Sequence, residues 1–159
     1  MSFDLGKSYL TFKTSDLEAL ARELLSDSVL EKAMSSALDE IERLLGENFE
    51  SRQSEWKPLA RSTQLQRLGQ GYGPTSPILV RSGTLKGNAV SGREIEIKDG
   101  EVRGDVFPND DAKAPYSDAS LGDYMEALDK IRPFYDLSDE QMEKVYTKFE
   151  ESLLSQLGA

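Results

Sequence analysis

A strictly alternating stretch in the second half of the chain decides the fold class. It reads Arg93-Glu94-Ile95-Glu96-Ile97-Lys98-Asp99-Gly100-Glu101-Val102-Arg103-Gly104-Asp105-Val106-Phe107. Alternation with a period of two is typical of a strand, and Asp-Gly between two such runs favours a tight hairpin turn. The stretch predicts a β-hairpin. Its polar positions Glu94, Glu96, Arg103 and Asp105 predict one face that contacts solvent or a partner.

Helical periodicity dominates on both sides of this hairpin. After the capping residues Ser26 to Ser28, an apolar stripe predicts a long helix. The stripe comprises Leu30, Met34, Ala37, Leu38, Ile41, Leu44, Leu45 and Phe49. Near the end of the chain, Ser138 and Gln141 form a capping box that predicts a last helix. The buried side of that helix is expected to carry Met142, Val145, Tyr146, Phe149, Leu153 and Leu157.

Several shorter elements complete the predicted fold. We expect a strand over Ser8–Lys13, a short helix from Ser15 to Ser26, another strand near Gly87 to Ser91, and a short helix within Tyr116 to Leu128. The predicted fold class is α+β: a small antiparallel sheet with a β-hairpin packed against a long amphipathic helix, plus a long extended loop and a C-terminal helix. At 159 residues, the chain 1–159 is expected to form a single domain, with an interaction loop at about 51–83.

Composition removes several classes of function. The chain has neither Cys nor His, which excludes disulfides, cysteine nucleophiles, imidazole-based triads and zinc sites of the usual Cys/His type. The net charge of -10 disfavours nonspecific binding of nucleic acid or anionic membranes. No segment has the apolar length of a membrane span and no secretion signal is recognised, so a soluble protein is expected.

Positive charge is concentrated in one segment. Between Trp56 and Arg93 there are six cations and no Asp or Glu, which leaves 13 cations and 29 anions elsewhere. The six are Lys57, Arg61, Arg67, Arg81, Lys86 and Arg93. The segment could contact acidic protein surfaces, neutralise phosphates of nucleic acid, or be a solvated loop. Contact with protein is favoured, because only Trp56 and Tyr72 could serve as aromatic platforms for bases.

Candidate ligand sites in the sequence are weak. The Gly69-x-Gly71-x-Gly73 pattern is followed by Pro74 and lacks the strand and helix that a phosphate loop requires, so a turn or hinge is favoured. The Glu94/Glu96 pair and Asp110-Asp111 could bind a hard cation, although neither has calcium-loop spacing. No catalytic residue, cofactor or metal is therefore expected, and the protein is predicted not to be an enzyme. A carboxylate-based hydrolase remains the less favoured alternative.

Four short motifs, in a fixed order, resemble the phage virion morphogenesis family of Mu-like tail-completion or neck proteins. They are Trp56-x-Pro58-Leu59-x-x-x-Thr63, Ile78-Leu79-Val80-x-Ser82-Gly83-x-Leu85, Ala114-Pro115-Tyr116 and Arg132-Pro133-Phe134. In this family a helical N-terminal part precedes the first motif and a hairpin follows the second. The chain departs from the family after Tyr116, where a histidine and an aromatic-glycine pair usually follow.

The resemblance implies a structural virion protein that completes the tail end and joins it to the head connector. It implies a homo-oligomeric, hexameric ring in the virion neck, formed in the host cytoplasm, which meets connector, adaptor and tail-tube proteins while genomic DNA passes without specific binding. Alternatives are a head-tail adaptor, a tail-tube component or another oligomeric interaction protein. The residues expected to form the interface lie in the loop: Trp56, Leu59, Arg61, Arg67, Tyr72, Ile78, Leu79, Arg81 and Leu85.

Overall fold

The computed structural model describes residues 8–13, 26–75, 84–99, 101–109 and 121–158. Its elements in chain order are β1 (Ser8–Lys13), α2 (Asp27–Ser51), the 3-10 turn η2 (Arg52–Ser54), α3 (Arg61–Gly69), α4 (Thr84–Asn88), β2 (Gly92–Lys98), β3 (Glu101–Phe107), α5 (Leu121–Asp129) and α6 (Asp139–Leu157). The residues cluster into two compact units, and α2 contributes to both. The α+β class expected from the sequence is confirmed.

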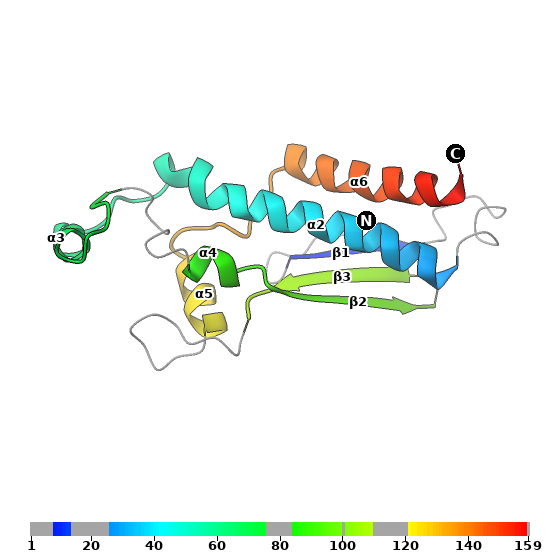
Figure 1. Ribbon diagram of the computed structural model, residues 1–159, viewed down its shortest axis with the longest axis horizontal. Helices are drawn as coiled ribbons and strands as arrows, with labels where there is room; N and C mark the ends of the chain where they lie inside the picture. Colours follow the sequence, from blue (N-terminus) through cyan, green and yellow to red (C-terminus); the bar gives the residue numbers. More distant parts are fainter. Residues whose placement is uncertain (1–7, 14–25, 76–83, 100, 110–120, 159) are drawn as a thin grey trace. The chain divides into compact units, whose positions relative to one another are not determined.

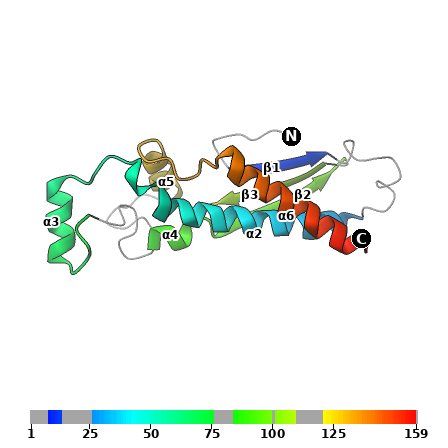
Figure 2. The ribbon, with the colours of Figure 1, turned by 90° about the horizontal axis from the view of Figure 1, so that it is seen from above.

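The first unit comprises residues 1–44, 93–106 and 136–159 and contains the sheet. The strand order is β1-β3-β2, and β1 pairs antiparallel with β3 from Ser8 opposite Val106 to Lys13 opposite Glu101. The helices α2 and α6 lie side by side on one face of this sheet (Figures 1 and 2). The predicted hairpin is confirmed, and Asp99 in its turn has a positive φ of 51°.

Burial alternates along β3 as the sequence predicts. Val102, Gly104 and Val106 are buried, whereas Glu101 and Arg103 are exposed. A Cβ atom added to Gly104 would lie 2.7 Å from Sδ of Met34 and 2.9 Å from Cδ2 of Leu38. The central strand therefore approaches α2 so closely that only glycine fits without a shift in packing.

Both long helices begin at the capping residues that the sequence indicates. At α2, the Ser26 hydroxyl accepts from the Val29 amide at 3.4 Å. At α6, Ser138 and Gln141 form the complete capping box. Of the six predicted apolar contacts of α6, four side chains are buried, Tyr146 is half-buried and Leu157 is exposed. The Gln156 amide donates to the Val29 carbonyl at 3.3 Å, which joins α6 to the first turn of α2.

The second unit comprises residues 45–92 and 107–135 and is built from short helices. Two predictions are wrong here. The segment expected to be a strand near Gly87 to Ser91 instead begins in helix α4 and continues as a turn. The loop expected at 51–83 is partly helical, because η2 and the nine-residue helix α3 lie within it. The polar composition of residues 61–69 obscured this helix in the sequence.

Other expectations fall on parts of the chain that the structure does not describe. These are the short helix from Ser15, Gly100 of the hairpin turn, the side chains of Ile78, Leu79 and Arg81, the Asp110-Asp111 pair, and Ala114-Pro115-Tyr116. The division into one domain also stays a prediction. Among the described helices, none is long and apolar enough to cross a membrane.

Candidate interaction surface

Trp56 lies in the core of the second unit. Its side chain is 6 % exposed and belongs to a cluster with Phe49, Ala89, Met125 and Phe134, against which Leu59 also packs. Burial of aromatic rings is the largest apolar contribution that such a small unit can make. Trp56 and Leu59 were expected to anchor a neighbouring subunit. In this chain their apolar surface instead contacts residues of the same subunit, and Trp56 is not an exposed anchor.

Polar contacts hold the Arg132-Pro133-Phe134 segment against the same cluster. The side chain of Asn48, 1 % exposed, donates to the Phe134 carbonyl at 3.0 Å. A carboxylate oxygen of Asp129 accepts from the amides of Phe134 and Tyr135 at 2.8 and 3.1 Å. Each of these bonds satisfies a backbone group that burial would otherwise leave costly. The turn after α5 is therefore held by side chains that no sequence motif had marked.

Two of the four motifs thus meet in space although about 75 residues separate them. Trp56 and Phe134 share one buried cluster, and the Arg132 guanidinium donates to the Lys57 carbonyl at 3.3 Å. The Tyr135 hydroxyl donates to the Ala89 carbonyl at 2.7 Å, which adds the segment after α4. These motif residues form part of the buried core of the second unit.

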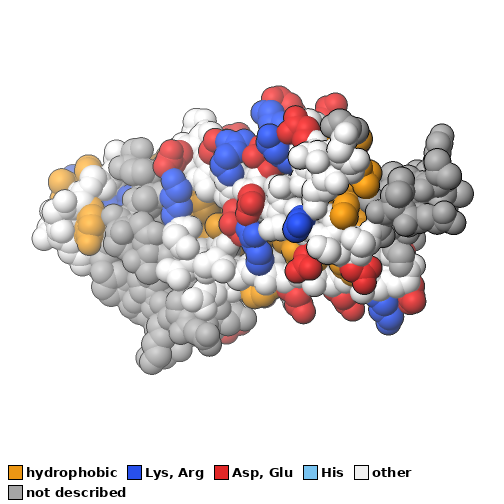
Figure 3. All heavy atoms as spheres, turned by 45° about the vertical axis from the view of Figure 1, so that its right-hand side comes forward, with side chains coloured by type: hydrophobic (Ala, Val, Ile, Leu, Met, Phe, Trp, Pro, Cys, Tyr) orange, Lys and Arg blue, Asp and Glu red, His pale blue; other side chains and the backbone are white. Residues whose placement is uncertain are grey.

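The cations of the 56–93 segment are not all available to a partner. Lys86 pairs with Glu50 at 2.5 Å, and Arg93 pairs with Asp39 at 2.6 Å and Glu42 at 2.7 Å. Figure 3 shows such blue and red side chains next to one another on the surface. The expectation of one uniformly basic loop is therefore corrected. The acidic face of α2 neutralises part of it within the subunit.

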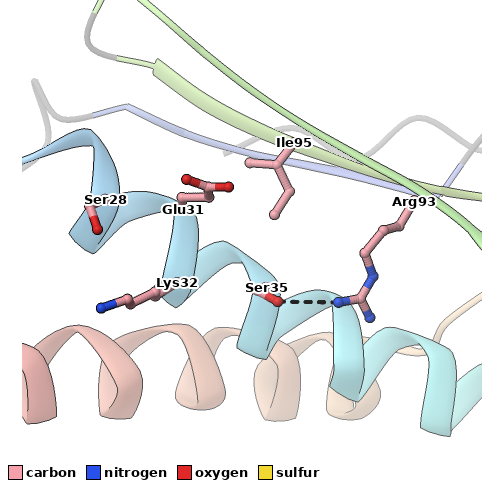
Figure 4. Close-up of a pocket in the computed structure, with 6 residues that line it drawn as sticks. All are labelled: Ser28, Glu31, Lys32, Ser35, Arg93 and Ile95. Atoms are coloured by element: carbon pink, nitrogen blue, oxygen red, sulfur yellow. Dashed lines mark hydrogen bonds between the residues drawn. The ribbon is translucent and has the colours of Figure 1, made fainter.

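Arg93 also lines an open hollow between α2 and β2 (Figure 4). Its guanidinium donates to the Ser35 hydroxyl at 3.2 Å as well as to Asp39 and Glu42. The hydrogen bond to Asp39 raises the pKa of Arg93 above its usual range, although partial burial opposes this shift. Because the guanidinium is already bound by two carboxylates, the hollow is poorly suited to capturing an anion. No cluster of potential metal ligands occurs among the described residues.

The glycine-rich turn lies at the wrong end of a helix for phosphate binding. Gly69 is the last residue of α3, and Gly71 adopts a left-handed conformation with φ 79°. The amides of Gly71 and Tyr72 donate to the carbonyls of Leu68 and Arg67. These amides satisfy the last carbonyls of the helix, as in a helix C-cap. Anions bind at the N-terminus of a helix, whereas this turn lies at the C-terminus of α3. The glycine-rich pattern is therefore better explained as a turn than as a phosphate-binding loop.

Helix α3 carries two of the most exposed large apolar side chains of the described residues, and only Ile131, which follows α5, is more exposed. Leu65 is 60 % exposed and Leu68 is 56 % exposed, and Arg61 on the same face is exposed as well. Of the other predicted interface residues, Arg67 is 5 % exposed and has a partner within the chain, Tyr72 is half-buried, and Leu85 lies in α4. Among the candidates whose side chains the structure describes, only Arg61 is exposed.

Leu65 and Leu68 were missed as site residues. Their spacing from Arg61, four and seven positions along the chain, is the signal that could have revealed them. Comparison with family models, curated proteins and solved structures finds no match for this chain. The candidate surface consequently rests on the geometry of the chain itself: the face of α3 formed by Arg61, Leu65 and Leu68, which we call the α3 stripe.

The ion pair between Glu40 and Arg43 gives a pH-dependent test of the first unit. Arg43 donates to both carboxylate oxygens of Glu40, at 2.8 and 2.6 Å, and this bond is the main reason why the pKa of Glu40 is lowered. A lowered folded-state pKa stabilises the fold above the unfolded-state pKa, and the gain is lost as the pH falls through the folded-state pKa.

We expect Glu40→Gln to reduce the free energy of unfolding by about 1 kcal/mol at pH 7, since Arg43 is half-exposed and the pair is only partly shielded from solvent. The difference from the unmodified protein should shrink as the carboxylate becomes protonated. Urea unfolding at a series of pH values below 7 measures it. Glu143→Gln, at an exposed position of α6, serves as the control and should show a difference that is near zero throughout.

Proposed function

We propose that this chain is a structural virion protein that completes the end of a phage tail and joins the tail to the head connector. The observation that carries the proposal is the meeting of the Trp56 and Phe134 motifs in one buried cluster. Residues of two motifs that resemble those of the tail-completion family pack together in this chain, which supports a shared structural role for the two motifs. Their order along the chain and the α+β class support the same reading.

The proposed mechanism is assembly without bond-making chemistry. The buried Trp56 fixes the chain shortly before α3, and α3 carries the exposed leucines and Arg61. Copies of the chain would form a ring at the neck, hexameric as the resemblance implies, in contact with connector and tail-tube proteins. The acidic excess of the chain, -10 overall, would let DNA pass without adhering.

Particles from a host that carries this coding sequence provide the test. Gold-labelled antibody against the chain should bind at the head-proximal end of the tail, and deletion of the coding sequence should leave full heads and tails unjoined. Label that stays with tailless heads would instead support a head-tail adaptor. Normal, infectious particles in the deletion strain would overturn the proposal.

A further inference from the structure

The α3 stripe has the pattern of a helix that docks on another protein. Arg61, Leu65 and Leu68 are spaced i, i+4 and i+7, which places them on one side of the helix. Single exposed leucines are ordinary, but two of them more than half-exposed on a nine-residue helix form a continuous apolar strip with a cation at its start. Strips with this spacing are how short helices bind complementary surfaces.

Helix α6 carries a matching strip on its outer side. Glu150, Leu154 and Leu157 have the same i, i+4, i+7 spacing, and we call them the α6 stripe. Leu154 is 53 % exposed, Leu157 is 38 % exposed and Glu150 is exposed. The buried side of α6 is formed by other residues, so these leucines are not required by the core of the chain that the structure describes. A carboxylate occupies the position that a guanidinium has in α3.

We infer that the α3 stripe of one copy docks on the α6 stripe of a second copy, with the two helices parallel. This inference rests on the self-assembly in the proposed function, and it names the two surfaces that would meet. In this register Leu65 lies opposite Leu154, Leu68 opposite Leu157, and Arg61 opposite Glu150. Each exposed leucine is then covered by another, and the two charges compensate one another.

Charge complementarity favours the parallel contact between the α3 and α6 stripes over other contacts between stripes. Two α3 stripes packed in parallel would bring Arg61 close to its own copy, and two parallel α6 stripes would do the same for Glu150. An antiparallel arrangement of any two stripes would place each charged residue beside a leucine, so that Arg61 would lie beside Leu157 or Leu68 and neither charge would be compensated. Opposed like charges cost affinity, while the parallel register opposes unlike ones. The contact between α3 and α6 is therefore favoured over contacts between identical surfaces.

The contact joins different surfaces of two copies, so each copy can bind two neighbours. Contacts of this kind produce a ring if the rotation closes and an open filament if it does not. A nine-residue helix is only about 14 Å long, so one such contact buries little area and binds weakly by itself. Closing a ring adds one more contact, between the two end copies, so that every copy is held by two contacts and the assembly is strengthened. Assembly should accordingly depend steeply on protein concentration.

Sedimentation velocity of the full chain over a range of concentrations tests the inference. Leu65→Asp and Leu154→Asp should each raise the concentration for half-assembly by about tenfold or more, because each places a carboxylate in an apolar contact. Gln66→Asp and Ser155→Asp add the same charge at exposed neighbouring positions of the same helices and should assemble like the unmodified protein. Circular dichroism and thermal unfolding of all four variants verify that they are folded.

Mixing the two impaired variants gives the decisive measurement. Leu65→Asp keeps an intact α6 stripe and Leu154→Asp keeps an intact α3 stripe, so only one contact can form between them. At concentrations high enough to populate this single weak contact, the mixture should form a dimer of twice 17.7 kDa and nothing larger, while each variant alone stays monomeric. The charge swap adds a second test: Glu150→Arg should restore assembly to Arg61→Glu. A mixture that stays monomeric at these high concentrations, or Leu65→Asp that assembles normally, would overturn the inference.

The two proposals can fail separately. A protein that never self-associates contradicts the α3–α6 contact, while its place in particles is decided by antibody labelling and by the deletion strain. Conversely, a chain that assembles through these stripes but is absent from particles keeps the contact and loses the virion role.

Discussion

Replacing Phe134 with alanine is expected to lower the free energy of unfolding by about 3–5 kcal/mol. The ring is fully buried, and its centroid lies 4.7 Å from that of Phe49 and 4.5 Å from that of Tyr135. Removing it leaves a cavity in the centre of the second unit, and the neighbouring rings cannot all move to fill it. The free energy of unfolding of a small domain is only about 5–15 kcal/mol, so this loss would remove a large part of it.

The backbone contacts of this position isolate the contribution of the ring. The amide of Phe134 donates to Asp129 and its carbonyl accepts from Asn48, and an alanine keeps both groups. Urea unfolding followed by fluorescence measures the effect, because Trp56 is the single tryptophan and lies in the same cluster. Ile131→Ala, three positions away and 65 % exposed, is the control and should change stability by less than about 0.5 kcal/mol. Equal losses in the two variants would contradict the buried position of Phe134.

Adding one methyl group at Gly104 is expected to destabilise the first unit by about 1–3 kcal/mol. Alanine normally stabilises an ordered position relative to glycine, because it restricts the unfolded chain. At Gly104 steric overlap outweighs this gain, since the new Cβ would lie 2.7 Å from Sδ of Met34. Met34 is a flexible side chain, but it is fully buried and cannot move without displacing its neighbours.

Gly87→Ala is the matched control for this overlap. Gly87 lies in helix α4, and an added Cβ there meets nothing within 4 Å. That substitution should leave stability unchanged or raise it by up to about 1 kcal/mol. Thermal unfolding of both variants gives the comparison. If Gly104→Ala is as stable as Gly87→Ala, β3 and α2 do not approach each other as closely as the structure indicates.

Elements with a strong local signal were predictable. The hairpin has strict alternation and an Asp-Gly turn, and α6 has its capping box at Ser138. In each case the decisive interactions join residues close in sequence. The strand expected near Gly87 to Ser91 was wrong for the opposite reason. Its short run of small and polar residues has little strand preference of its own. In the structure this segment is a helix followed by a turn, and Ala89 is buried in one cluster with the distant residues Phe49 and Phe134.

The candidate surface was predictable only in outline. The sequence places Arg61 in a cation-rich segment without acids, and it remains exposed in the structure. The sequence could not indicate that Arg67 is buried. It also could not indicate that Arg93 is bound by Asp39 and Glu42, because these residues lie 54 and 51 positions away from Arg93 along the chain. Nor did it distinguish Leu65 as an exposed residue from Leu59 as one that packs against the core.

By itself, the sequence determined the α+β class, the hairpin, the two capped helices and the concentration of positive charge between Trp56 and Arg93. Periodicity, turn residues and caps act over a few positions, so they can be read directly along the chain. Only the tertiary structure decided that Trp56 is a core residue and that the α3 and α6 stripes are exposed. Burial depends on which distant residues come together, and an apolar side chain has the same identity whether it is covered or left for a partner.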